Sequence, residues 1–144
     1  MMIEHVTLDS SFLVSFFSVS ESHFEASKKL MNFADQKKII LLVPMIVLLE
    51  AFHTLRRTGI FENHHEYNKF QSFLNSESIK YFDLDMSFFN MFKEFPFFNE
   101  LKTSDAIIAA SAFINKSILI SWDKKLLQNS WQGYTPDGFL KKFA

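Results

Sequence analysis

The apolar run IILLV, residues 39–43, constrains the fold of this chain more than any other feature. Its branched residues do not alternate with polar ones, which is typical of a strand buried on both faces of a parallel sheet. Pro44 follows at once, and a helical pattern then continues to a glycine stop at Gly59. We therefore expect a central strand that leads directly into a helix, as in α/β folds.

The same alternation of strand and helix continues along the whole chain. Further strands are expected at residues 3–8, 78–84 and 117–121. Helices are expected at residues 10–19, 21–36, 62–76, 105–116 and 124–130, with a Phe-rich helix that ends at Pro96 and a last helical turn within 135–143. This order predicts a three-layer α/β/α sandwich with a central, mainly parallel sheet of four to five strands. Because no repeat or linker interrupts it, we expect a single domain over residues 1–144.

Composition excludes several classes of function. The chain has no cysteine, which excludes thiol catalysis, Cys-ligated zinc and disulfides, and favours an intracellular, cytoplasmic protein. Its formal net charge of −1 argues against binding nucleic acid by bulk electrostatics. The longest apolar run, residues 39–49, is too short to span a bilayer and contains a proline, so no membrane association is expected.

Aspartates recur where the predicted strands and helices meet. Asp9 ends the first strand, Asp123 follows the last one, and Asp105 opens the helix between residues 105 and 116. Each could simply cap a helix, because a carboxylate accepts the free N–H groups there. Ligands in parallel α/β folds bind at the carboxyl ends of the strands, so these residues could equally form one site.

Glu50 has no capping role to explain it. It interrupts an apolar helical segment, and a buried carboxylate is costly unless it is paired or binds a metal. A salt bridge to Arg56 or Arg57 is the structural alternative. If all four acids converge, their repulsion requires a hard cation, and carboxylate oxygens suit Mg²⁺ or Mn²⁺.

Other catalytic patterns are missing or incomplete. The sequence has no G-x-S-x-G elbow and no glycine-rich phosphate loop, which excludes the corresponding hydrolase, P-loop and dinucleotide-binding classes. Glu50 and His53 give only one E-x-x-H step, whereas a di-iron bundle needs two on an all-helical frame.

Four segments of the chain resemble the motifs of the PIN-domain ribonucleases, and among these the VapC-like toxins of type II toxin–antitoxin systems. They are LDSSFLVSFF with Asp9, VPMIVLLEAFHTLRR with Glu50, LKTSDAIIAASA with Asp105 and ILISWDKKL with Asp123. The closing TPDGFL also resembles the C-terminal end of that family. Their order and spacing, more than any single motif, carry the resemblance.

The resemblance implies a Mg²⁺- or Mn²⁺-dependent endoribonuclease in which Asp9, Glu50, Asp105 and Asp123 are the catalytic metal ligands. Ser11 and Ser121 would orient these carboxylates, or would be plain turn residues. Further implied are an RNA substrate, an antitoxin protein that binds the aromatic surface, and a homodimer.

Two alternatives remain open from the sequence. The chain could be a catalytically inactive PIN-fold module that binds a protein partner, or a PIN nuclease of RNA processing outside any toxin–antitoxin pair. The Phe-rich segment over residues 88–98 suggests a partner surface, because it carries more aromatic residues than one face of a short helix can bury.

Overall fold

The computed structural model describes residues 2–144, except for the side chain of Phe97. One sheet runs through the molecule, with the strand order β3-β2-β1-β4-β5, and every neighbouring pair is parallel. Its strands are β1 (His5–Leu8), β2 (Ile40–Pro44), β3 (Ile79–Phe82), β4 (Ile118–Ile120) and β5 (Gly133–Tyr134). The predicted parallel sheet of four to five strands is confirmed.

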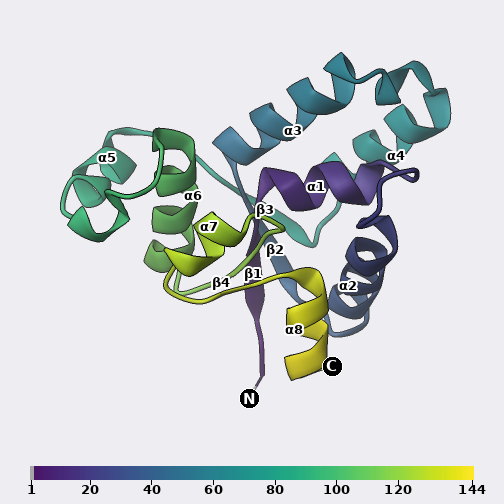
Figure 1. Cartoon of the computed structure of the whole chain (residues 1–144). Coiled ribbons are helices and arrows are strands. Elements are labelled where there is room, and N and C mark those ends of the chain that lie inside the picture. Colours follow the sequence, from purple (N-terminus) through teal and green to yellow (C-terminus); the bar gives the residue numbers. More distant parts are fainter. Residues whose placement is uncertain (1) are drawn as a thin grey trace.

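Helices cover the sheet on both sides, as the predicted three-layer sandwich requires. They are α1 (Ser10–Phe17), α2 (Phe24–Gln36), α3 (Met45–Arg57), α4 (His64–Leu74), α5 (Met86–Phe92), α6 (Thr103–Ile114), α7 (Lys124–Gln128) and α8 (Pro136–Phe143), with short 3-10 turns η1 (Ile60–Glu62) and η2 (Pro96–Phe98). In Figure 1, α5, α6 and α7 lie on one side of the strands, and α2, α4 and α8 lie on the other. The helices α1 and α3 begin where β1 and β2 end.

The sequence-based boundaries hold to within a few residues, with two differences. Pro44 forms the last residue of β2 and pairs with Phe82, so α3 starts one residue later than expected. The two-residue strand β5 was not located by periodicity. It extends the sheet because the Leu119 and Ser121 amides donate to the carbonyls of Gln132 and Tyr134.

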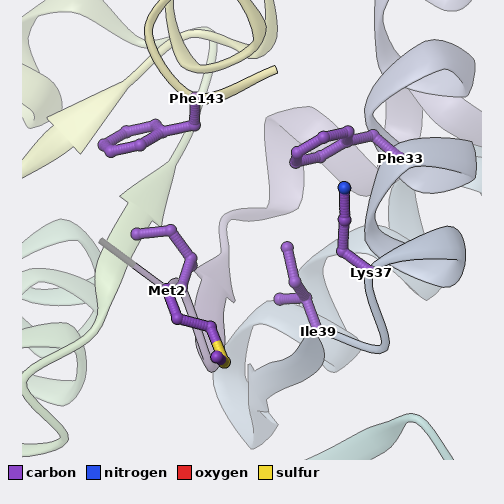
Figure 2. A pocket seen from close by; sticks show the side chains of 6 residues that line it. Met2, Phe33, Lys37, Ile39 and Phe143 are labelled. Carbon is purple, nitrogen blue, oxygen red and sulfur yellow. The ribbon is translucent and has the colours of Figure 1, made fainter.

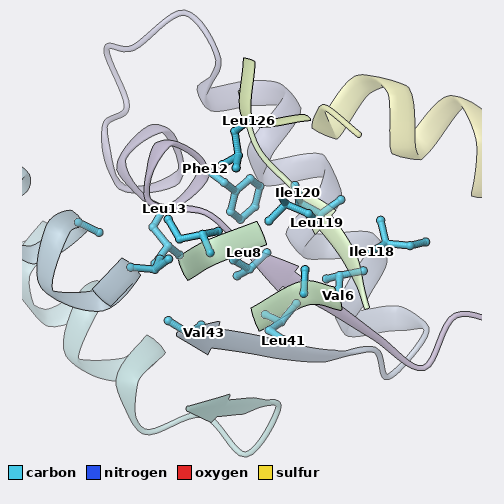
Figure 3. Close-up of a cluster of buried hydrophobic side chains, with 14 of the residues drawn as sticks. Val6, Leu8, Phe12, Leu13, Leu41, Val43, Ile118, Leu119, Ile120 and Leu126 are labelled. Carbon is cyan, nitrogen blue, oxygen red and sulfur yellow. The ribbon is translucent and has the colours of Figure 1, made fainter. Parts of the chain in front are cut away.

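The core forms where the central strands meet α1 and α6. Val6 and Leu8 of β1 lie opposite Ile118 and Ile120 of β4, and all four side chains are buried. Figure 3 shows Leu8 and Ile120 near Phe12 of α1, and Leu41 and Val43 on the neighbouring strand β2. Leu119, which points to the opposite face of β4, is buried as well, and burial on both faces explains why β4 appears as a continuous apolar run in the sequence.

The Phe-rich segment is turned mainly inward. Phe88 of α5 is buried and packs edge-on against Phe82 of β3, and Phe95 packs against Phe113 of α6 in the same manner. Among the phenylalanines of this segment whose side chains the structure describes, Phe89 is the exposed exception, at 52%. The aromatic surface available to a partner is therefore smaller than the sequence suggested.

No helix in the described part of the chain is both long and apolar enough to cross a membrane.

Candidate functional site

The candidate site lies where the chain reverses its direction across the sheet. From β1 the strands proceed to β2 and β3 on one side, and the chain then returns to place β4 on the other side of β1. The carboxyl ends of β1 and β4 therefore flank a topological switch point, where open α/β sheets bind their ligands. Asp9 follows β1, and residues 121–123 follow β4.

Asp9 is a buried carboxylate, with 4% of its surface exposed. It occupies the N-cap position of α1 but its side chain makes no capping hydrogen bond, so the capping explanation is wrong for this residue. Its Oδ2 atom instead accepts hydrogen bonds from the hydroxyls of Ser11 (2.8 Å) and Ser121 (2.6 Å). The Asp9 amide also donates to the Ile120 carbonyl at 3.0 Å, which fixes the backbone against β4.

The two serines connect the ends of β1 and β4 through one hydrogen-bond network. Ser11 lies 3.2 Å from Ser121, oxygen to oxygen, and accepts the amide hydrogen of Trp122 at 3.0 Å. Ser121 accepts the amide hydrogen of Asp123 at 2.9 Å. Asp123 does cap a helix, because its Oδ1 accepts from the Leu126 amide at 3.2 Å. A cap occupies only one of its two carboxylate oxygens, which leaves the other for a ligand.

Glu50 reaches the same place from the second turn of α3. Its pKa is raised above the ordinary value, first because it is partly buried and second because Asp9 and Asp105 are nearby, although Lys102 and Ser10 act in the opposite direction. The sequence context of Glu50 predicted that its charged form would be unfavourable. Carboxyl groups with a shifted pKa are typical of functional sites.

Asp105 lies in the first turn of α6, so this helix begins at the same edge of the sheet. Burial raises the pKa of its carboxyl, and the proximity of Asp123 and Asp9 adds to the effect. Lys102, the exposed residue before α6, lowers it but does not cancel the increase. The lysine therefore only partly compensates the negative charge of the acids.

All four predicted acids line one open cavity of about 400 Å³. As the side chains stand, the described residues include no group of three or more His, Asp or Glu that is arranged to hold a metal ion. The donor set still fits a hard cation, because it consists of carboxylate oxygens and because burial, and then the nearby acids, raise the pKa values of Glu50 and Asp105. Small side-chain adjustments around the anchored Asp9 would be needed to bind it.

Sequence reasoning missed several residues that line this cavity. Trp122 lies between Ser121 and Asp123, and His23 stacks on its indole ring with 3.7 Å between ring centroids. Glu21 and Lys102 also line the cavity. No local pattern indicated His23, since it is 99 positions from Trp122 in the chain. Trp122 could have been considered, because it lies inside the fourth motif.

A second cavity of about 490 Å³ lies at the opposite edge of the sheet, near the start of β1 and β2. Met2, Phe33, Ile39 and Phe143 line it, and Lys37 reaches into it from the end of α2 (Figure 2). None of its lining residues is acidic, in contrast to those of the first cavity.

Comparisons with known proteins agree with the predicted fold. The model of the PIN domain family matches residues 6–131, which include all four acids. No curated protein sequence matches the chain. Several solved structures have a similar fold at low identity.

The VapC20 toxin of Mycobacterium tuberculosis, described as cleaving the sarcin–ricin loop, is 16% identical with a TM-score of 0.67, over 85% of this chain and 93% of that one. A toxin–antitoxin complex from Klebsiella pneumoniae contains a chain that is 16% identical with a TM-score of 0.66, over 91% and 97%. VapBC2 from Rickettsia felis, bound to a DNA fragment from its promoter, gives 14% identity and a TM-score of 0.68, over 91% and 98%. With its sheet order, its acidic cavity and the family match over most of its length, the chain belongs to the PIN domain family.

Proposed function

We propose that this protein is a metal-dependent endoribonuclease, a hydrolase of RNA phosphodiester bonds, and the toxin of a toxin–antitoxin pair. The observation that supports it most directly is the shared cavity of Asp9, Glu50, Asp105 and Asp123 at the switch point of the sheet. Membership of the PIN domain family supports nuclease chemistry. The cytoplasm is the proposed location, and residues 1–144 are proposed to act as one domain.

The proposed metal ligands are the four carboxylates, with Mg²⁺ or Mn²⁺ as the cation. When bound, such an ion neutralises phosphate charge and lowers the pKa of a water molecule that attacks phosphorus. Asp9 is the most constrained ligand, because Ser11 and Ser121 hold its Oδ2 atom and thereby fix its orientation. Asp123 keeps one oxygen for the cation while the other caps α7.

Basic residues near the acids have a separate role in this proposal. Lys102 lines the cavity beside Glu50 and Asp105, where it can meet a non-bridging phosphate oxygen. Lys124 and Lys125 are exposed at the start of α7, directly after Asp123, and are proposed to contact the RNA backbone in a salt-sensitive way.

An antitoxin partner is proposed because structural neighbours include toxin–antitoxin complexes from Klebsiella pneumoniae and Rickettsia felis. Leu84, Met86 and Phe89 give exposed apolar side chains around α5, which suit a helix or strand from such a partner. Pairing of two copies of this chain is part of the same proposal. Sizing of the purified chain, alone and with the product of a neighbouring gene, measures both associations.

The decisive experiment compares RNA cleavage by wild type, Asp9→Asn and Glu50→Gln with added Mg²⁺ or Mn²⁺ and with chelator. Cleavage by wild type only, and only with metal, is the expected result. Glu77→Gln serves as a matched control, because Glu77 is exposed and outside the cavity lining. Full activity of the Asp9 or Glu50 variant would reject the proposed site.

Two alternatives have their own outcomes in this experiment. A catalytically inactive PIN-fold module would leave RNA intact under every metal condition while still binding a protein partner. A nuclease of RNA processing would cleave a defined precursor and would not inhibit growth when expressed without a partner, whereas a toxin would inhibit growth.

A further inference from the structure

His23 and Trp122 form a stacked pair of rings beside the acidic cavity. Their centroids are 3.7 Å apart and their planes differ by 11°. Both residues line the cavity that also contains Asp9 and Asp123. The proposed chemistry of the carboxylates involves neither ring, so the pair calls for its own explanation.

The indole ring of Trp122 is rigidly held. Its Nε1 atom donates to the hydroxyls of Ser15 and Ser27, at 3.1 Å each, and these buried serines lie 2.7 Å apart, oxygen to oxygen. The Trp122 amide donates to Ser11, which in turn binds Asp9. One hydrogen-bond network therefore fixes the indole relative to the carboxylate.

The imidazole ring of His23 is placed differently. Its backbone is anchored, because the amide donates to Glu21 Oε2 at 3.1 Å and the carbonyl accepts from Ser27 at 3.1 Å. Its side chain makes no capping bond at the start of α2, and the residue is exposed. One face of the imidazole meets the indole, and the exposed residue also lines the cavity.

We propose that the stacked rings of His23 and Trp122 are a base-binding platform, on which the nucleobase next to the scissile phosphate stacks through the exposed face of His23. This inference rests on the proposed ribonuclease function. An RNA strand with a phosphate at the carboxylates has a base next to that phosphate, and the two stacked rings line the same cavity as the carboxylates. Stacking of a base on an aromatic ring contributes about 1–3 kcal/mol and tolerates any base.

The platform also restricts the form of RNA that fits. A base can lie on His23 only if its face is free, which requires an unpaired nucleotide from a loop or a single strand. The cavity of about 400 Å³ has room for a ligand of nucleotide size. The protein is therefore expected to cut unpaired RNA.

The test begins by mapping a cut site in total RNA and making a short oligonucleotide around it. Oligonucleotides that each carry one abasic position, on either side of the cut, are then compared. The KM for cleavage and the Kd for binding in the presence of chelator are measured for each. One abasic position next to the cut is expected to weaken wild-type binding about 5- to 150-fold. The same abasic position should not weaken RNA binding by His23→Ala any further. His23→Phe should remain as sensitive to that abasic position as wild type.

This design separates a platform from a merely structural ring. A structural role would make the protein and RNA changes additive, since each would act independently of the other. His64→Ala is the matched control, because His64 is an exposed histidine outside the cavity lining and should behave as wild type. If wild type cleaves RNA but shows no abasic sensitivity, or if His23→Ala keeps it, the platform is refuted and the nuclease function stands. If wild type cleaves no RNA with either metal, both proposals fail.

Discussion

Replacing Ser121 with alanine removes a single oxygen atom from inside the protein. That hydroxyl donates to Asp9 Oδ2 at 2.6 Å and accepts the Asp123 amide hydrogen at 2.9 Å. Because a hydrogen bond to a charged group contributes about 1.5–3 kcal/mol, we expect Ser121→Ala to lower the free energy of unfolding by that amount. For 144 residues the entropy of unfolding at the midpoint is about 0.3 kcal/mol/K, so the expected decrease in Tm is about 5–10 °C.

The same change should weaken function, because Asp9 and Asp123 would both lose a group that orients them. A loss of about 10- to 100-fold in RNA cleavage is expected, as for other groups that support metal ligands. Thermal unfolding and cleavage at saturating Mg²⁺ measure the two effects on the same preparation.

Ser117→Ala separates these effects. Ser117 is as buried as Ser121 and stands at the other end of β4, where it accepts a neutral hydrogen bond from Thr7 at 2.9 Å. Its replacement should cost about 0.5–1.5 kcal/mol and leave cleavage unchanged. Equal effects of the two substitutions on both stability and cleavage would refute the argument that Ser121 acts through Asp9.

Three further predictions concern the charges of the site and the Phe-rich segment. The pKa values of Glu50 and Asp105 are raised in the folded protein, so the metal-free protein should lose stability as the pH rises from their ordinary pKa values of 4.5 and 3.8. Melting curves at pH 5 and 7.5 should show a smaller loss for Glu50→Gln than for wild type. Adding Mg²⁺ at neutral pH should raise the Tm of wild type more than that of Glu50→Gln, and equal shifts would argue against a cation at Glu50. Phe88→Ala should cost about 3–5 kcal/mol, whereas Phe89→Ala should change the free energy of unfolding by less than about 0.5 kcal/mol; similar values for both would contradict the inward packing of α5.

The sheet could be predicted from the sequence because its central strands carry a strong local signal. β2 and β4 are apolar runs, and β1, β2 and β4 are each followed by a helical pattern. β5 has only two residues, which is too short for any periodicity, and its pairing depends on the backbone of residues 119–121. The boundary at Pro44 was missed because a proline at a strand end and one at the first turn of a helix have the same local sequence.

The positions of the acids were predictable because strand ends in a parallel sheet share one edge. The resemblance also implied Ser11 and Ser121 as groups that orient the carboxylates, but the sequence could not distinguish this role from that of turn residues, because Ser121 is 112 positions from Asp9. Likewise, the inward packing of the phenylalanines depends on contacts with β3 and α6. His23 lies in a loop and Trp122 at the end of a strand, so no local sequence pattern predicts that their rings stack.

Asp9 and Ser121 are 112 positions apart, and this separation sets the order in which the site is completed during translation. A nascent chain that has left the ribosome as far as β3 already contains Asp9 and Glu50. The edge of β1 that pairs with β4 in the folded protein is still unpaired at that stage. Asp9 then lacks the Ile120 carbonyl and the Ser121 hydroxyl that hold it in place. If the proposed nuclease function holds, the site is therefore complete only after β4 has emerged, and the ribosome that makes this protein does not meet a finished site while most of the chain is being synthesised.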